Sequence, residues 1–408
     1  MKCRHCSVDD SESFIDLGAS PPSNAYLSYN ALSAPETYYP LRAFVCKNCW
    51  LVQTEDFARA DELFASDYAY FSSVSHSWLK HAAEYADMIT SRLGLGKQNF
   101  AIEVACNDGY LLRHFVAAGI PCLGIEPTAS TAAAAEGLGI PVLREFFGKI
   151  LAKRLAAAGR RADLIIGNNV FAHVPDINDF AEGLYAALQP GGTITLEFPH
   201  FARLIEHIQF DTIYHEHFSY LSLHAVNHIL NSVGLKIWDV EELSTHGGSL
   251  RVFACHADDA RIVTSAVNRV LTEEVDSGLL DPATYRNFQA RANRLKDEFV
   301  AFLIDKKRDG RSVVGYGAAA KGNTLLNYSG IKPDLLPYVC DAAPSKQGKY
   351  LPGTRIPICE PNVLKERKPD YVLILPWNIA DEVTAQHRYV IEWGGRFIVA
   401  VPQLREID

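Results

Sequence analysis

The sequence has few of the features that would place a protein in or on a membrane. Its longest apolar runs fall short of the roughly 18 residues that a membrane-spanning helix needs. The first six residues, from Met1 to Cys6, contain no apolar stretch of the kind that forms the centre of a secretory signal. We therefore expect a cytoplasmic protein with no membrane partner, in a compartment where cysteine thiols stay reduced.

Positive charge is also scarce. The 408 residues include 39 Lys and Arg against 48 Asp and Glu, which gives a formal net charge of −9. Nucleic acids and anionic membranes attract clustered basic residues, so this balance argues against both as partners. A local basic pocket for one phosphorylated ligand remains compatible with it. No internal repeat or low-complexity tract is present, and the length is typical of two or three globular domains.

Three regions differ in composition and hydrophobic pattern: residues 1–72, residues 73–260 and residues 261–408. In the middle region, short apolar runs alternate with helical stretches, which is typical of βαβ units and a parallel sheet. These runs are residues 100–105, 121–125, 140–143, 163–167, 193–198, 235–240 and 250–255. The last two follow each other closely, beside the Gly247-Gly248 turn, and predict an antiparallel hairpin at the sheet edge.

The third region begins with polar residues that have apolar positions at helical spacing. Residues 262–307 predict long helices with a break near Gly278 and Pro282. A second, smaller α/β unit follows, with apolar runs at residues 313–315, 336–339, 371–375 and 397–401.

Four cysteines form two pairs with metal-ligand spacing. Cys3 and Cys6 make one C-x2-C knuckle, Cys46 and Cys49 make the other, and 39 residues separate the two. Each knuckle can chelate from one tight turn, so four thiolates can close a tetrahedral zinc site. Such a site has no open position for a reactant, and we expect a structural Zn²⁺. The alternative is two unrelated pairs of reduced cysteines.

Polar and small residues follow the first strands of the middle region. Residues 100–105 run into a turn with Asn107 and Gly109 and then a helix, with Glu103 inside the strand, while Glu126 follows the second strand. Ligands of α/β sheets bind outside the carboxyl ends of such strands, and a carboxylate there can accept ribose hydroxyls. With Asn168 ending the fourth strand and Pro190-Gly191-Gly192 preceding the fifth, the pattern resembles class I methyltransferases.

That resemblance implies S-adenosylmethionine as the cofactor, with six cofactor-binding residues: Glu103, Ala105, Asn107, Gly109, Glu126 and Asn168. Ala105 departs from the family, which often has glycine at this position. The alternative is a doubly wound domain that binds another nucleotide.

A base-rich run, Tyr214-His215-Glu216-His217, occurs late in the middle region. Histidine titrates near neutral pH, so this run suits proton transfer. A zinc-protease helix would need histidine at position 219, where Ser219 stands. A His-x-His metal site and a polar loop with capping side chains remain as alternatives.

Taken together, the motifs resemble those of the zinc-containing sugar C-methyltransferases, which build branched deoxysugars such as tetronitrose and mycarose. The resemblance spans the whole chain and rests on the four cysteines, Tyr68-Ala69-Tyr70, residues 103–109, residues 214–217 and Gly247-Gly248. It implies transfer of a methyl group to a carbon, C-3′, of a 4-keto-deoxysugar linked to dTDP or a similar nucleotide. The active-site residues that it implies are Tyr68, His173, Tyr214, Glu216 and His217, with Tyr70 at the substrate.

Methylation at a carbon beside a ketone needs a base and donors that hold the enolate oxygen. His217 is the candidate base, with Tyr214 as the next choice. Glu216 can orient a histidine, and His173 or Tyr68 can donate to the enolate.

The glycine-rich stretch Gly315 to Gly322 follows a predicted strand and opens a helix. We interpret Gly315, Gly317 and Lys321 as a cradle for the substrate diphosphate, since a helix start with a lysine favours phosphate. In the resembled family this unit helps hold the nucleotide. Because the stretch also fits G-x-G-x-x-A, with Asp341 ending the next strand, a dinucleotide site and a structural turn are the alternatives.

The expected fold is α/β: a seven-stranded class I methyltransferase domain, an N-terminal zinc-binding lobe and a C-terminal Rossmann-like domain, with the active site between domains. We expect a monomer. The competing functions are a methyltransferase of the same fold that acts on another carbon, oxygen or nitrogen, an NAD-linked oxidoreductase and a non-catalytic nucleotide-sugar-binding protein.

Overall fold

The computed structural model describes residues 1–57 and 71–407. Tyr68 and Tyr70 lie outside the described residues. No helix in the described part of the chain has the length and apolar character needed to cross a membrane.

The centre of the molecule is a seven-stranded sheet in the order β10-β11-β8-β7-β4-β5-β6. Its strands are β4 (Ala101–Val104), β5 (Cys122–Ile125), β6 (Val142–Leu143), β7 (Ala162–Asn168), β8 (Leu188–Pro199), β10 (Leu235–Leu243) and β11 (Ser249–His256). The neighbouring strands β6, β5, β4, β7 and β8 are parallel, and β11 pairs antiparallel with both β8 and β10. The predicted class I methyltransferase sheet and its edge hairpin are therefore confirmed.

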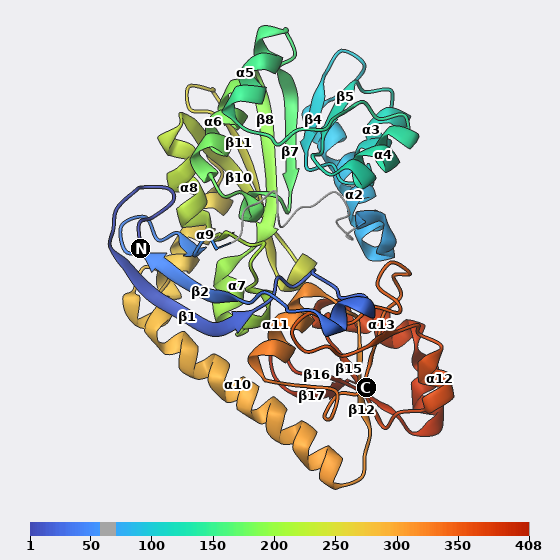
Figure 1. Ribbon diagram of the computed structural model, residues 1–408. Coiled ribbons are helices and arrows are strands. Elements are labelled where there is room, and N and C mark those ends of the chain that lie inside the picture. Colours follow the sequence, from blue (N-terminus) through green and yellow to red (C-terminus); the bar gives the residue numbers. More distant parts are fainter. Residues whose placement is uncertain (58–70, 408) are drawn as a thin grey trace.

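Helices cover both faces of this sheet (Figure 1). On one face lie α2 (His76–Leu93), α3 (Leu112–Ala117) and α4 (Ala129–Gly137), which share an apolar core. The opposite face packs against α5 (Lys149–Ala157), α6 (Ile177–Ala187) and α8 (Leu223–Ser232) in a second core. Two apolar faces explain why the parallel strands read as continuous apolar runs.

The zinc lobe is built on a four-stranded sheet in the order β1-β2-β3-β9. Three strands come from the N-terminal region: β1 (Ser11–Ser20), β2 (Tyr39–Cys46) and β3 (Val52–Thr54). The fourth, β9 (Ser219–Tyr220), comes from the methyltransferase unit and pairs antiparallel with β3. Since β9 starts two residues after His217, this pairing attaches the base-rich run to the zinc lobe.

Two helices lead to the C-terminal unit, α9 (Ser265–Asp276) and α10 (Pro282–Arg308), the long diagonal helix of Figure 1. The predicted break is confirmed: Gly278 has a φ of +81°, and Asp281 caps α10 with Pro282 in its first turn. Helix α10 packs against β1, and Phe14 contacts Tyr285 and Phe288. One apolar core thus runs through the zinc lobe, α10 and the C-terminal unit.

The C-terminal unit has a six-stranded sheet in the order β14-β13-β12-β15-β16-β17. Its strands are β12 (Val313–Tyr316), β13 (Val339–Cys340), β14 (Ile358–Cys359), β15 (Tyr371–Ile374), β16 (Arg396–Val399) and β17 (Arg405–Ile407). Its helices are α11 (Ala320–Tyr328), α12 (Val363–Arg367) and α13 (Ala380–Gln386). The expected Rossmann-like unit is present. The edge strands β14 and β17 were missed because neither lies in a continuous apolar run: prolines flank Ile358 and Cys359 closely, and β17 contains Arg405 and Glu406.

Candidate active site and zinc centre

The four predicted zinc ligands come together in the N-terminal lobe. The thiol sulfurs of Cys3, Cys6, Cys46 and Cys49 all lie within 4.8 Å of one another. The Sγ atoms of Cys3 and Cys49 are 3.6 Å apart, and those of Cys6 and Cys46 are 3.5 Å apart. Tetrahedral Zn²⁺ with Zn–S bonds of about 2.3 Å places its sulfurs about 3.8 Å apart. The four thiols therefore fit Zn²⁺.

The two knuckles have the same backbone construction. The carbonyl of Cys3 accepts from the N–H of Ser7, and the carbonyl of Cys46 accepts from the N–H of Trp50. Ser7 and Trp50 both adopt left-handed conformations, with φ of 62° and 60°. This shared turn aims both cysteines of each pair at one point, which is what chelation requires.

The predicted cofactor residues gather at the carboxyl ends of β4, β5 and β7. In chain order the sheet grows from β4 toward β6 on one side and from β7 toward β8 on the other, so β4 and β7 flank its topological switch point. Open α/β sheets bind their ligands in the crevice outside this point. Asn107 follows β4, Glu126 follows β5 and Asn168 ends β7.

Two buried polar groups at this edge have no protein partner among the described residues. Neither carboxylate oxygen of Glu103 and neither amide atom of Asn168 has a hydrogen bond. Burial raises the pKa of Glu103 well above its usual range, and the nearby charges of Glu126 and Asp108 add to the effect. Buried polar groups are expensive unless they are satisfied, so these atoms fit a polar ligand such as S-adenosylmethionine.

The turn after β4 holds its shape by unusual backbone geometry. Ala105, Asn107 and Gly109 all have positive φ, at 57°, 49° and 78°. Ala105 thus takes the left-handed conformation for which glycine is better suited. Gly109 serves packing as well: a Cβ atom there would lie 2.4 Å from Cδ1 of Ile140.

Glu126 fixes this turn through backbone contacts. Its carboxylate accepts hydrogen bonds from the N–H groups of Asn107, at 3.0 Å, and Thr128, at 2.9 Å. Asn107 and Asp108 in turn accept from the N–H groups of Ser72 and Ser73. The end of β5, the turn after β4 and the segment before α2 are therefore linked at the cofactor edge.

The predicted proton-transfer residues also converge. His173 ends the 3-10 helix η3 (Phe171–His173), and His217 follows the 3-10 helix η4 (Phe210–Thr212). Their ring centroids are 4.6 Å apart, and the rings of Tyr214 and His217 are 4.0 Å apart. Burial lowers the pKa of His173 to about 4 and that of His217 well below its usual range. Both imidazoles are therefore neutral at physiological pH.

Backbone carbonyls set the tautomer of each histidine. Nδ1 of His173 lies 2.7 Å from the carbonyl oxygen of Glu216, and Nδ1 of His217 lies 3.1 Å from that of Thr212. A carbonyl oxygen only accepts, so each Nδ1 must carry the hydrogen. The lone pair of each neutral ring is then on Nε2, where it can take a proton.

The two other members of the run have different environments. Glu216 accepts a hydrogen bond from Nδ2 of Asn24, at 3.0 Å, and burial raises its pKa to about 7. Nε2 of His215 faces the carbonyl oxygens of Tyr39 and Pro40 in β2. Both side chains therefore attach the run to the N-terminal region.

His246 is a site residue that the sequence reasoning missed. It precedes the Gly247-Gly248 turn and has a φ of 55°, a strained conformation for a histidine. Its Nε2 lies 3.2 Å from Nδ2 of Asn169, which directly follows β7, and its ring centroid is 5.1 Å from that of Trp78. Burial, and then the charge of Lys321, lower its pKa to about 4. The sequence feature that could have identified His246 is its position directly before the Gly247-Gly248 turn.

Three backbone N–H groups of the C-terminal glycine-rich loop already have hydrogen-bond acceptors within the protein. The N–H of Gly317 donates to the carbonyl of Cys340, the N–H of Ala318 to Oδ2 of Asp341, and the N–H of Ala319 to the carbonyl of Gly317. Asp341, the residue that supported the dinucleotide alternative, accepts hydrogen bonds from the backbone N–H groups of Ala318 and Ala343.

Lys321 leaves this loop and packs beside residues that follow β15. Its ammonium donates to Oδ1 of Asn378 at 2.6 Å and lies 4.4 Å from the ring centroid of Trp377. Nε1 of Trp377 donates to Oδ2 of Asp211, at 2.7 Å, in η4. A Cβ atom on Gly247 would lie 2.3 Å from the Trp377 ring. The start of α11 therefore borders the turns that carry His217 and His246.

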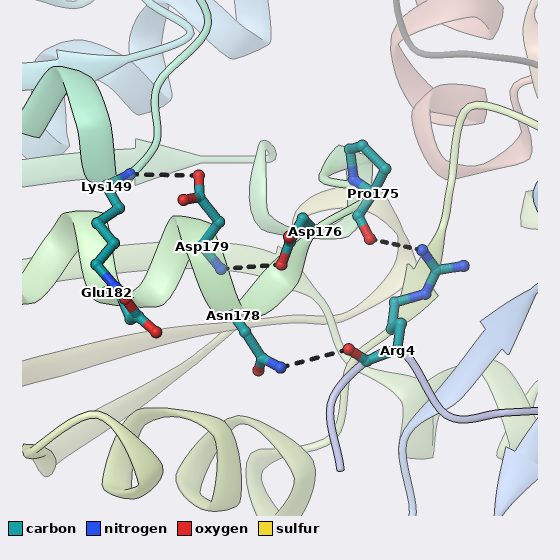
Figure 2. Close-up of a pocket in the computed structure, with 7 residues that line it drawn as sticks. All are labelled: Arg4, Lys149, Pro175, Asp176, Asn178, Asp179 and Glu182. Carbon is teal, nitrogen blue, oxygen red and sulfur yellow. Dashed lines mark hydrogen bonds and ion pairs between the residues drawn. The ribbon is translucent and has the colours of Figure 1, made fainter. Parts of the chain in front are cut away.

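A surface pocket of about 480 Å³ lies elsewhere, between the zinc lobe and α6 (Figure 2). Its polar groups are largely paired with one another: Arg4 donates to the carbonyl of Pro175 at 2.8 Å, and Lys149 pairs with Glu182. The pocket shares no residue with the cofactor edge or the histidine cluster.

Family models match three parts of the chain. A zinc binding domain matches residues 3–64, a methyltransferase domain matches residues 78–240 and a C-methyltransferase C-terminal domain matches residues 244–402. The C-methyltransferase NovU of Streptomyces niveus is 35% identical over 407 residues, which cover 100% of this chain and 97% of that protein.

Solved structures resemble this chain only distantly. A protein from Pyrococcus horikoshii OT3 is 11% identical, with a TM-score of 0.38, over 49% of this chain and 99% of its own. Magnesium protoporphyrin IX methyltransferase from Synechocystis PCC 6803, solved with bound SAM, is 16% identical, with a TM-score of 0.32, over 44% of this chain and 80% of its own. Similarities this distant carry no weight for function.

Proposed function

The chain belongs to the C-methyltransferases that carry an N-terminal zinc-binding domain, and we propose that it methylates C-3′ of a 4-keto-deoxysugar linked to dTDP or a similar nucleotide. The methyl donor is S-adenosylmethionine, as in other members of the class I fold. When bound at the carboxyl edge of the seven-stranded sheet, it supplies an electrophilic methyl group.

The observation that carries the proposal is the tautomer of His217. With Nδ1 hydrogen-bonded to the carbonyl of Thr212, the ring directs its lone pair through Nε2. Since the pKa of His217 is lowered well below its usual range by burial, the ring stays unprotonated and able to accept a proton at neutral pH. Oxygen methylation needs one base and no enolate support, whereas carbon methylation needs both.

The proposed reaction has two bond changes at the acceptor. His217 takes the proton from the carbon beside the ketone, and the C–H electron pair forms an enolate whose negative charge is on oxygen. The enolate carbon would then take the methyl group that bound S-adenosylmethionine supplies, with the C–S bonding pair remaining on sulfur, and the ketone would be restored. One proton is released for each methyl group transferred.

Glu216, Tyr214 and His173 complete the proposed machinery around His217. Glu216 has a raised pKa of about 7 because it is buried, so near neutral pH much of it carries a proton that it can donate. The nucleotide of the substrate is proposed to contact the C-terminal unit around Gly315 and Gly317. Tyr68 and Tyr70 stay predictions, because they lie outside the described residues.

A product assay tests the proposal. The enzyme is incubated with S-adenosylmethionine and a panel of nucleotide-linked 4-keto-deoxysugars, and the position of the new methyl group is found by NMR. We expect a carbon–carbon bond at C-3′. A product methylated on oxygen or nitrogen, or no product from any keto-sugar, would contradict the proposed acceptor.

A further inference from the structure

The enolate oxygen needs donors, and His173, one of the two residues expected to supply them, is poorly suited to do so. His173 already uses its Nδ1 hydrogen on the carbonyl of Glu216 at 2.7 Å, so its Nε2 has no hydrogen to give in the neutral ring. With a pKa lowered to about 4 by burial, His173 is not protonated at neutral pH either. The developing negative charge therefore calls for donors other than His173.

The C-terminal unit brings a cation close to the turns that carry His217 and His246. Its sheet has a switch point of its own, between β12 and β15, and Lys321 crosses that point to reach Asn378. In the described part of the chain, no carboxylate oxygen lies within 4.0 Å of the Lys321 ammonium. A half-buried ammonium whose hydrogen-bond acceptor is one amide oxygen has donors left over for an anion.

Trp377 connects Lys321 to the turns that carry His217 and His246. Its indole N–H binds Asp211, three residues before Tyr214, while its ring presses on Gly247, the neighbour of His246. Thr324 of α11 also donates to the carbonyl of Ile213, at 2.9 Å. Consistent with this placement, the Lys321 charge is among the causes that lower the pKa of both His217 and His246, after burial.

His246 adds a second group at the same place. A buried network holds the turn that carries it: Glu197 at the end of β8 accepts from Arg251 at 3.0 Å and from Thr245 at 3.3 Å. Where Asn169 donates to Nε2 of His246, the hydrogen of the neutral ring is on Nδ1, ready to be donated. Backbone strain of this kind persists where the surroundings enforce it, often at reactive centres.

We propose that Lys321 and His246 are catalytic residues that hold the enolate oxygen of the keto-sugar, where the carboxyl edges of the two sheets meet. The ammonium supplies charge, the imidazole supplies a second hydrogen bond, and His217 takes the proton. This inference rests on the proposed function. It assigns Lys321 to the reacting carbonyl rather than to the diphosphate that the sequence analysis expected it to hold. In the same loop, the N–H groups of Gly317, Ala318 and Ala319 already have acceptors.

Hydrogen exchange at the carbon that will be methylated measures enolate formation separately from methyl transfer. The full-length enzyme is incubated in deuterated water with S-adenosylhomocysteine and a saturating dTDP-linked 4-keto-deoxysugar, and deuterium at C-3′ is followed by NMR. We expect Lys321→Met and His246→Gln each to slow exchange by roughly 10²- to 10³-fold, as loss of one oxyanion donor does elsewhere. Lys321→Arg keeps the charge and should recover part of the rate.

Matched variants control for folding and for general loss of charge. Lys332→Met removes an exposed lysine just beyond the carboxyl end of α11, and His256→Asn removes a histidine at the far end of β11. Both should exchange at the wild-type rate. The affinity of all variants for S-adenosylhomocysteine, measured by calorimetry, should stay within about threefold of the wild-type value. A threefold change is well below the roughly 1.4 kcal/mol that corresponds to a tenfold change.

Affinity for dTDP, measured alone, distinguishes the two anions that Lys321 can meet. If Lys321→Met binds dTDP tenfold more weakly but exchanges normally at saturating sugar, the lysine holds the diphosphate and the proposal is wrong. Normal exchange in both Lys321→Met and His246→Gln would also overturn it. A wild-type enzyme that exchanges no keto-sugar would overturn the proposed function together with this inference.

Discussion

Nδ1 of His217 lies 3.1 Å from the backbone carbonyl oxygen of Thr212, and this contact decides which nitrogen of the proposed base is basic. The carbonyl holds the hydrogen on Nδ1 and leaves the lone pair on Nε2. Since Thr212 ends the 3-10 helix η4, the short helix determines the chemistry of the ring five residues later.

Replacing His217 with asparagine should therefore remove the base while keeping a side-chain N–H that can still reach Thr212. We expect deuterium exchange at C-3′ and methyl transfer to slow by roughly 10²- to 10⁴-fold, the usual size of a general-base contribution. Tyr214→Phe is the comparison: it should slow exchange comparably only if the phenol takes the proton. Affinity for S-adenosylhomocysteine should not change. Exchange at the wild-type rate in His217→Asn would show that the base is another residue.

Much of the fold follows from local sequence patterns. The seven strands of the central sheet were predicted because buried parallel strands give continuous apolar runs, and the break before α10 was predicted from Gly278 and Pro282. The zinc ligands were predicted because C-x2-C spacing encodes chelation within one turn. In each case, neighbours along the chain carry the information.

Contacts between distant segments could not be read in this way. The pairing of β9 with β3, the closure of Asp341 on Ala318, and the position of His246 beside Asn169 all join residues far apart in sequence. His173 and His217 were placed in one site by family resemblance, and their tautomers depend on carbonyls that only the folded backbone positions. Strand β9 has two residues, too few for any periodicity to appear.

Zinc should be bound at one equivalent per chain in protein purified without chelator. A structural zinc site contributes folding free energy, so Cys46→Ser should bind less than one equivalent and unfold at a markedly lower temperature. Cys359→Ser, which changes a cysteine outside the cluster, should keep its zinc and its unfolding temperature. Metal analysis by mass spectrometry and thermal unfolding would measure both. Zinc-free protein with an unchanged unfolding temperature would exclude a structural role.

Glu126 should matter for the cofactor in two ways. Its carboxylate is predicted to accept from ribose hydroxyls, and it already holds the N–H groups of Asn107 and Thr128. Glu126→Ala should therefore weaken S-adenosylhomocysteine binding by roughly 1–3 kcal/mol in calorimetry, because charged hydrogen bonds are lost. Glu136→Ala, on the exposed side of α4, should bind normally. Equal affinities for the two variants would remove Glu126 from the cofactor site, and tight binding of NAD would contradict the cofactor assignment.

Glu216 should make the stability of the protein depend on pH in a direction opposite to that of most carboxylates. Burial raises its folded-state pKa to about 7, whereas the unfolded chain has the usual value near 4.5. Between these two values the folded protein binds more protons than the unfolded chain, so the free energy of unfolding falls as pH rises through that window. Above pH 7 the penalty for keeping an ionised carboxylate in this site is complete.

Glu216→Gln cannot ionise and should escape that penalty. Relative to wild type, its free energy of unfolding should increase between pH 4.5 and pH 8 by an amount on the order of 3 kcal/mol, from a pKa difference of about 2.5 units. Thermal unfolding across this pH range would measure it, with Glu298→Gln on the exposed face of α10 as the control. Parallel pH curves for wild type and Glu216→Gln would mean that Glu216 is solvated in the folded state. A diverging pair of curves, with methyl transfer reduced in Glu216→Gln, would show a buried acid retained at a cost in stability because the reaction uses it.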